Sequence, residues 1–164
     1  MSSSDPVLFA EISALLNDSA FEVFATIFNL ELRAGAPADV FAGEGAPIAA
    51  TVGVVGDVNL TIGLHLQVPF ACGLTRHFLR LDETAAIDDT MINDVVGEVS
   101  NMILGSVKSR LCDQGRTCTL TLPVVHRGKN SPTPTSLPGD ATGQLSLACG
   151  KESIRLDLLL RRSA

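Results

Sequence analysis

The segment from Asp88 to Cys112 is the most regular part of the chain and limits most strongly what it can fold into. On a helical wheel of about 100° per residue, apolar side chains fall on one broad face. These residues are Ile92, Val95, Val96, Val99, Met102, Ile103 and Val107. Asp88 or Asp89 is expected to cap the helix, and Gln114-Gly115 to end it. Such a long apolar face has to be buried against another layer of structure.

Three further elements are predicted before this helix. Asp5-Pro6 indicates a helix start, and apolar residues at helical spacing continue to about Asn29, as one long helix or two short ones. The β-branched stretch 50–66 is interrupted by Gly56-Asp57, which predicts a β-hairpin. Residues 69–79 begin with proline and predict a short helix. The Gly-, Ala- and Pro-rich residues 34–47 are interpreted as a connector.

The remainder of the chain is predicted to be mainly strands. Residues 117–125 alternate Thr with Leu or Cys, as expected of a strand, and residues 130–143 are loop-like. Residues 144–148 and 153–160 predict a final hairpin. This order of elements favours an α/β (α+β) layered fold, a mostly antiparallel sheet packed by long helices. The length favours one domain over residues 1–164.

Composition excludes several classes of protein. Hydrophobic residues make up 46% of the chain and charged residues only 18%, so intrinsic disorder is not expected. The formal net charge is −6, which is the wrong sign for general attraction to phosphate backbones. The chain has no Trp or Tyr to stack on bases. We therefore expect neither nucleic-acid binding nor a membrane partner, since no apolar run approaches the ~18 residues of a membrane span.

The amino terminus and the cysteines indicate a reducing compartment. No basic region followed by an apolar stretch opens the chain, so no secretory signal is expected. The four cysteines are scattered without the close pairing of zinc sites, and they are interpreted as small core residues. They are Cys72, Cys112, Cys118 and Cys149. A cytoplasmic protein with no metal site of its own is predicted.

Opposite its apolar face, the long helix carries a polar row. Asp94, Glu98 and Asn101 stand at positions i, i+4 and i+7, which places them on one side of the helix. A solvated surface is the ordinary explanation of such a row. However, two like charges at i and i+4 cost a helix a few tenths of a kcal/mol. The row is therefore a candidate docking surface for a partner.

Two glycines strengthen this interpretation. Gly97 and Gly105 lie inside the helix, where each costs about 1 kcal/mol relative to alanine. Their lack of a side chain suits a surface that another backbone approaches closely. Simple packing of this helix on another helix remains an alternative explanation.

At these residues the sequence resembles a known family. The passage Asp94-Val-Val-Gly-Glu98-Val-Ser-Asn101 resembles the Asp/Ser-xxx-Glu-xx-Asn signature of the CheC/CheX/FliY chemotaxis phosphatases. Pro123 lies one residue nearer to Asn101 than the corresponding proline of that family. CheC proteins carry a second Glu-xx-Asn on their first long helix. Here Glu11 and Glu22 are each followed by alanine at the third position, so the chain resembles the one-site CheX type.

The resemblance implies a hydrolase that removes the aspartyl phosphate of a CheY-like response regulator, in chemotaxis or related two-component signalling. Asn101 would align the attacking water, and Glu98 would pair with a lysine of the regulator. Asp94, Gly97 and Gly105 would contact that partner. The regulator would supply Mg²⁺, so the chain would need no cofactor of its own. The resemblance also implies a homodimer joined through a continuous sheet.

Other sequence features give weaker hypotheses. His65, His77 and His126 are far apart and are interpreted as surface or satisfied core residues. No GxxxxGK[ST], GxGxxG or GxSxG motif occurs, so a nucleotide site or a hydrolase elbow has no support. The main alternative function is a non-catalytic module of the same fold that binds a response regulator. The intact Glu98–Asn101 pair favours the phosphatase.

Overall fold

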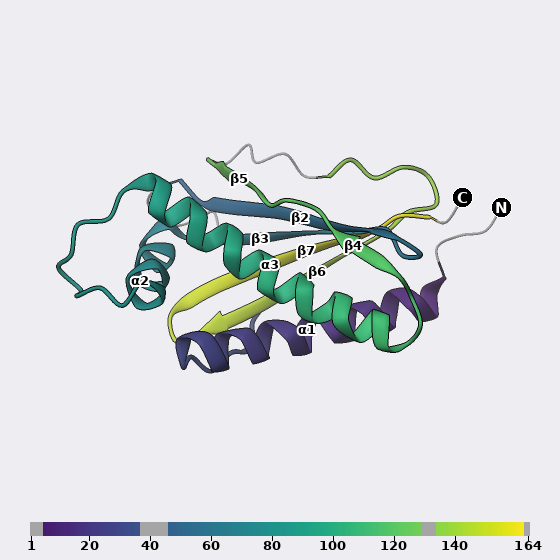
Figure 1. Cartoon of the computed structure of the whole chain (residues 1–164), viewed down its shortest axis with the longest axis horizontal. Coiled ribbons are helices and arrows are strands. Elements are labelled where there is room, and N and C mark those ends of the chain that lie inside the picture. The colour runs from purple at the N-terminus through teal and green to yellow at the C-terminus, as the bar shows by residue number, and fades with distance from the viewer. Residues whose placement is uncertain (1–4, 37–45, 129–133, 163–164) are drawn as a thin grey trace.

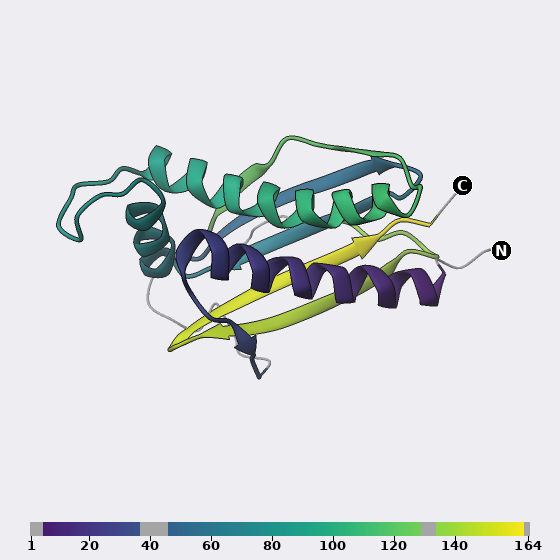
Figure 2. The ribbon, with the colours of Figure 1, turned by 60° about the horizontal axis from the view of Figure 1, so that its bottom comes forward.

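The computed structural model describes residues 5–36, 46–128 and 134–162. It has an α+β architecture in which a seven-stranded antiparallel sheet is covered on one face by long helices (Figure 1). Figure 2 shows the two longest helices side by side across this face, with the short helix at one end. The predicted fold class is therefore confirmed.

The first helix, α1 (Pro6–Phe28), is a single long helix. Asp5 caps it by accepting a 2.9 Å hydrogen bond from the Val7 N–H, and Pro6 occupies the first turn, where its missing N–H costs nothing. Asn29 ends the helix in the left-handed conformation, with φ of 53°. The predicted cap, start and end are thus confirmed, and the two-helix alternative is not.

The central hairpin consists of β2 (Ile48–Gly56) and β3 (Leu60–Leu66). Alternate residues on both strands are fully buried under the helices, and the intervening ones point to the opposite face of the sheet. Gly53 is tightly packed, because a Cβ there would lie 3.0 Å from the Leu60 carbonyl oxygen. The predicted hairpin is confirmed.

The order of strands in the sheet is β1-β6-β7-β3-β2-β4, with β5 also pairing β2. The carboxy-terminal hairpin β6 (Ala141–Cys149) and β7 (Glu152–Leu160) pairs β3 through β7. β1 (Arg33–Ala34) pairs β6, within the part that was predicted to be a connector. β6 also includes the last residues of the predicted 130–143 loop. Residues 37–45 and 130–133 of these two predicted segments lie outside the described residues.

The single strand predicted for residues 117–125 is wrong. The structure has two short strands there, β4 (Cys118–Leu120) and β5 (Val124–Arg127), and both pair β2. The Val54↔Leu120 and Thr51↔Val124 pairings leave one extra residue on the β4–β5 side, as in a β-bulge. Pro123 lies in this interruption, since its ring nitrogen cannot donate a hydrogen bond to the ladder.

The remaining helices are α2 (Val68–Phe78) and α3 (Asp89–Asp113). α3 packs against α1, where the Ser19 hydroxyl donates a 3.1 Å hydrogen bond to the Ser106 hydroxyl. An aromatic group lies where α1 meets α2: the Phe28 ring is 5.6 Å from Phe24 and 6.3 Å from Phe78, centroid to centroid. None of the described helices combines the length and hydropathy needed to cross a membrane.

The cysteines and histidines differ in their surroundings. Cys118 is buried, and Cys72 and Cys149 are half-buried, whereas Cys112 is exposed, so its assignment to the core was wrong. Cys112 lies in the last turn of α3, next to the exposed Asp113 and Gln114. His65 is buried beside Asp157, while His77 is exposed and packs its ring against Phe28. His126 is half-buried on β5.

Candidate functional site

The candidate site lies on α3, and local sequence fixes where that helix begins. The Asp88 carboxylate accepts a 2.8 Å hydrogen bond from the Met91 N–H, and Asp89 places a further negative charge at the positive end of the helix. From this start, Asp94, Glu98 and Asn101 follow on successive turns of one face. The helix is one element of 25 residues, so the spacing of the row is rigid.

The structure brings the predicted residues together along α3, with the acidic pair turned to the solvent and the two glycines turned toward the β4–β5 segment. Asp94 and Glu98 are exposed, while Asn101 and Gly105 are half-buried. Gly97 is buried. Six of the seven residues predicted for the apolar face are buried, and Met102 is half-buried. The helix thus has one face in the core and presents its acidic residues to the solvent.

The two glycines have different surroundings. A Cβ at Gly97 would lie 3.4 Å from Cγ of Pro123 and 3.6 Å from Cγ2 of Val125, so the chain's own β4–β5 segment already packs against this position. A Cβ at Gly105 would meet only Cδ1 of Leu120, at 3.8 Å, which is ordinary contact. Intramolecular packing therefore explains Gly97, and a contact of either glycine with a partner stays a prediction.

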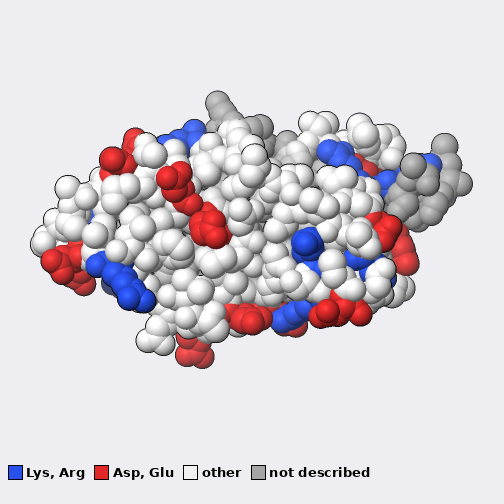
Figure 3. Space-filling model, viewed as in Figure 1, with Lys and Arg blue, Asp and Glu red and all other residues white. Residues whose placement is uncertain are grey.

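The two acidic side chains have no cationic partner within the described residues. No lysine, arginine or histidine nitrogen there lies within 4.0 Å of the Asp94 or Glu98 carboxylate. Arg127 is near the start of α3, but it pairs with Asp89 at 3.3 Å and with the Asn93 side-chain oxygen at 3.0 Å. Figure 3 shows acidic atoms over the amino-terminal half of α3 within mainly uncharged surface. The two carboxylates are therefore open to the solvent.

Asn101 has an unusual environment. Its side-chain oxygen is buried and, among the described residues, has no hydrogen-bond partner. A buried polar atom without a partner costs about 1–3 kcal/mol. A bound molecule that offers a hydrogen bond to this carboxamide would recover part of that cost.

A groove lies on each side of the acidic row. One, of ≈ 430 Å³, runs between α3 and the β4–β5 segment and is lined by Asn93, Asp94, Gly97, Glu98, Pro123 and Val125. The other, of ≈ 410 Å³, runs between the end of α2 and α3. Phe78, Leu79, Met91 and Val95 line it beside Asp94 and Glu98. The sequence had not indicated the α2 residues, because their position depends on the packing of α2 against α3.

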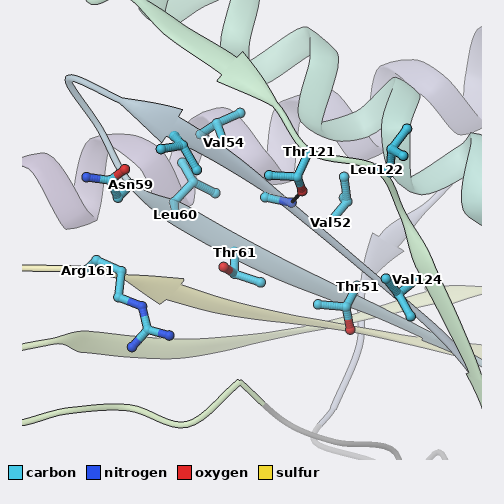
Figure 4. A pocket seen from close by; sticks show the side chains of 12 residues that line it. Thr51, Val52, Val54, Asn59, Leu60, Thr61, Thr121, Leu122, Val124 and Arg161 are labelled. Carbon is cyan, nitrogen blue, oxygen red and sulfur yellow. Dashed lines mark hydrogen bonds between the residues drawn. The ribbon is translucent and has the colours of Figure 1, made fainter.

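A third hollow, of ≈ 430 Å³, lies on the opposite face of the sheet (Figure 4). Thr51 and Thr61 point into it, because they alternate along their strands with the core residues Val52 and Ile62. Thr121 accepts a 2.9 Å hydrogen bond from the Gly53 N–H at its rim. Among the described residues that line it, only Arg161 is charged, and it pairs with Asp140 at 3.0 Å. These lining residues do not repeat the acid-and-amide arrangement of α3.

The site does not fit a resident metal ion. Within residues 5–36, 46–128 and 134–162, no three His, Cys, Asp or Glu side chains are grouped so that they could hold one. Asp94 and Glu98 alone offer two carboxylates on consecutive turns, fewer oxygen ligands than Mg²⁺ or Ca²⁺ takes.

Comparison with known proteins places this arrangement in a family. The profile described as "Chemotaxis phosphatase CheX" matches residues 48–139, which is more than half of the chain and includes all of α3. Among curated protein sequences, none matches this chain significantly.

Solved structures of chemotaxis proteins have the same fold. CheX from Vibrio vulnificus is 18% identical, with a TM-score of 0.75 over 92% of this chain and 97% of that one. CheX from Desulfovibrio desulfuricans is 19% identical, with a TM-score of 0.73 over 92% of this chain and 99% of that one. CheX from Borrelia burgdorferi, crystallised as a complex with CheY, BeF₃ and Mg²⁺, is 19% identical. Its TM-score is 0.67 over 91% of this chain and 97% of that one.

Proposed function

The chain belongs to the CheX family of chemotaxis phosphatases, and from that premise we propose that it hydrolyses the aspartyl phosphate of a CheY-like response regulator. The observation that carries this proposal is the pair Glu98 and Asn101 on one open face of α3. Glu98 has no cation beside it in the described chain, and Asn101 holds an unpaired carboxamide oxygen. The Borrelia relative crystallised with CheY supports a receiver domain as the partner.

In this proposal Asn101 positions the water that attacks phosphorus. A carboxamide both donates and accepts hydrogen bonds, so one of its atoms can bind the water while the other bonds to a group beside the phosphoryl group. Acyl-phosphate hydrolysis depends mainly on positioning and charge stabilisation, and correct placement of a nucleophile accounts for several kcal/mol of a barrier. Rotation of the Asn101 side chain out of its half-buried site would give its oxygen the partner it lacks.

Glu98 has the role of an anchor. It lies almost one turn before Asn101, so a lysine of the receiver that pairs with Glu98 would fix the position of α3 over the phosphorylated aspartate. Asp94, one turn farther, would add negative charge at the border of the contact. Any Mg²⁺ would belong to the receiver's site, since no three His, Cys, Asp or Glu side chains of the described residues are grouped to hold the ion.

A homodimer joined edge to edge through the sheet is part of the same proposal. β1 lies at one end of the strand order and β4 at the other, and an edge strand carries backbone groups that another strand can pair with. A cytoplasmic location is also proposed, since receiver domains would have to meet this protein there. Sedimentation equilibrium at micromolar concentration tests the dimer, and a monomer would contradict it.

A direct experiment tests the phosphatase activity. Receiver domains from the same organism are phosphorylated with acetyl phosphate in Mg²⁺, and phosphate release is followed with and without this protein. We expect faster release from at least one receiver. Asn17→Ala is a matched control, because Asn17 is a half-buried asparagine on α1, remote from the row along the chain, and it should leave the stimulation unchanged.

Two negative results have different meanings. If the protein binds a BeF₃⁻-activated receiver but never accelerates phosphate release, it is a binding module of the same fold. If it neither binds nor accelerates any receiver, the proposed function is wrong.

A further inference from the structure

The groove between α2 and α3 has a preformed apolar wall. Phe78 packs its ring 6.3 Å from that of Phe28, and Val95 is buried, so two of the apolar lining residues are held by the core. Leu79, which follows α2 directly, is nevertheless 39% exposed. Met91 is half-buried in the first turn of α3. The groove is thus a rigid apolar surface that the folded chain leaves open to solvent.

The α3 side of the groove also carries acidic residues. Asp94 and Glu98 line it on the same helix as Met91 and Val95, and none of the described lining residues is basic. Both carboxylates lack a cation within the described residues. A segment that fills this groove therefore has to present an apolar side chain to Leu79 and a positive charge to Asp94. An acidic segment would place like charges together, which costs free energy.

The groove is continuous with the proposed catalytic row, because Asp94 and Glu98 line the groove and also belong to that row. Figure 1 shows that the end of α2 and the start of α3 lie together at one end of the molecule, while β4 passes the other half of α3. A receiver bound over Glu98 and Asn101 would therefore lie directly beside this groove.

We propose that the α2–α3 groove is the specificity surface of the protein: it takes an apolar side chain of the response regulator, next to a lysine or arginine that pairs with Asp94. This inference rests on the proposed function and deepens it. The row from Glu98 to Asn101 acts on a phosphoryl group that all receivers share, whereas the groove reads a side chain in which receivers differ. Leu79 and Met91 set affinity and partner choice, and Asn101 sets the rate.

Leu79→Ser tests the apolar wall. The probe is a BeF₃⁻-activated, Mg²⁺-loaded receiver that the unaltered protein binds, and Kd is measured by titration calorimetry. Loss of this partly exposed leucine should weaken binding about fivefold. The turnover number at saturating phosphorylated receiver should stay unchanged. The matched control is Leu137→Ser, since Leu137 is 62% exposed and lies before β6, outside the lining of either groove.

A charge exchange tests the acidic residues of the groove. Asp94→Lys should weaken binding of the activated receiver. The lysines and arginines of the receiver are then changed to Glu one at a time. One of these changes should restore the affinity for Asp94→Lys. Restored affinity would show that Asp94 and that basic residue of the receiver interact directly. A merely structural role of Asp94 would give no such coupling. Circular dichroism melting of each variant separates loss of binding from loss of fold.

The outcomes distinguish the two proposals. If Leu79→Ser and Met91→Ser bind the receiver as tightly as the unaltered protein, the groove is not the specificity surface, and the phosphatase proposal stands. If the unaltered protein binds no activated receiver, both proposals are wrong.

Discussion

The helices α1 and α3 lie side by side on the sheet, and both carry exposed acidic side chains, but those acids have different neighbours. On α1, Glu11 pairs with Arg116 at 3.5 Å, and Glu22 pairs with Arg110 at 3.1 Å. Asp18 also lies 3.8 Å from Arg110. All three acids of α1 are thus balanced by cations from the carboxy-terminal end of α3 and the turn after it.

The central acids of α3 have no such cations. Asp94 and Glu98 face the solvent between two grooves, and no ion pair joins them to the described chain. The acids of α1 are paired within the molecule, whereas Asp94 and Glu98 are left open to the solvent. The two sets of carboxylates differ in their neighbours and not in residue type.

The largest effect is expected at Asn101. Asn101→Ala gives α3 the pattern that α1 already has, a glutamate followed by alanine at the third position. The stimulated rate of phosphate release should fall about 100-fold, because the water loses its positioning group. Binding of the BeF₃⁻-activated receiver should persist.

The same variant should be more stable than the natural protein. It removes a buried oxygen without a partner and adds the best helix former, which together should raise the free energy of unfolding by about 1 kcal/mol. Urea unfolding measures this change. A destabilised variant would show that Asn101 has a structural role, like the acids of α1.

The second largest effect is expected at Asp157, an acid whose partners lie even closer than those of the α1 acids. On the far face of the sheet, Asp157 accepts a 2.8 Å hydrogen bond from His65 and lies 3.1 Å from Nε of Arg155. The Asp157 side chain is only 21% exposed. Asp157→Asn should lower the free energy of unfolding at pH 7 by about 2 kcal/mol, since it removes the largely buried carboxylate that accepts a hydrogen bond from His65 and pairs with Arg155. Activity should change little.

The pH dependence of this effect has a definite sign. Burial raises the pKa of the Asp157 carboxyl, but the hydrogen bond and charge of His65, together with Arg155, outweigh burial and hold the pKa below the ordinary 3.8. A lowered pKa in the folded state gives stability that is present above about pH 4 and lost as the pH falls through the folded value. The difference in free energy of unfolding between the natural protein and Asp157→Asn should therefore have its full size at pH 7 and become smaller below pH 3.8. A constant difference across that range would contradict the assignment.

Glu98→Gln tests the comparison directly, with Glu22→Gln on α1 as its matched control. Removing the Glu98 charge should weaken binding of the activated receiver about tenfold, because a charge-assisted hydrogen bond is lost, while the melting temperature stays the same. Glu22→Gln should leave the affinity unchanged. Equal effects of both variants on affinity would mean that net charge, and not the position on α3, governs binding.

The smallest effect is expected for Arg110→Gln. This change removes the pairs with both Asp18 and Glu22, but these groups are partly exposed and the pairing is screened by water and salt. Urea unfolding should show a loss of about 0.5 kcal/mol at low salt and almost none at 1 M NaCl. A loss of receiver binding would contradict the structural role given to the acids of α1.

Several elements could be predicted because their causes lie within a few residues. Asp5-Pro6 and Asp88 start their helices by hydrogen bonds and ring geometry inside one turn. The turn at Gly56-Asp57 follows from local backbone preferences, and the row from Asp94 to Asn101 follows from helical spacing alone. The family signature depends on that same spacing, which is why the sequence alone indicated the CheX family.

Other features depended on residues far apart in the chain. The break at Pro123 follows from how two short strands pair with β2, and the packing of Gly97 follows from where that break places Pro123 and Val125. The α2–α3 groove exists because α2 packs against α3, which brings Leu79 and Met91 to the lining of one groove.

The sequence determined which acids and amides share a helix face, because that geometry repeats every turn. Only the tertiary structure decided which acids are paired. Arg110 and Arg116 pair with acids of α1 that lie about 90 to 105 residues away in the sequence. The residue pattern within one helix cannot predict a pairing over that separation. The candidate site is distinguished by two unpaired acids that share one face of α3 with Asn101, and pairing is a property of the packed molecule.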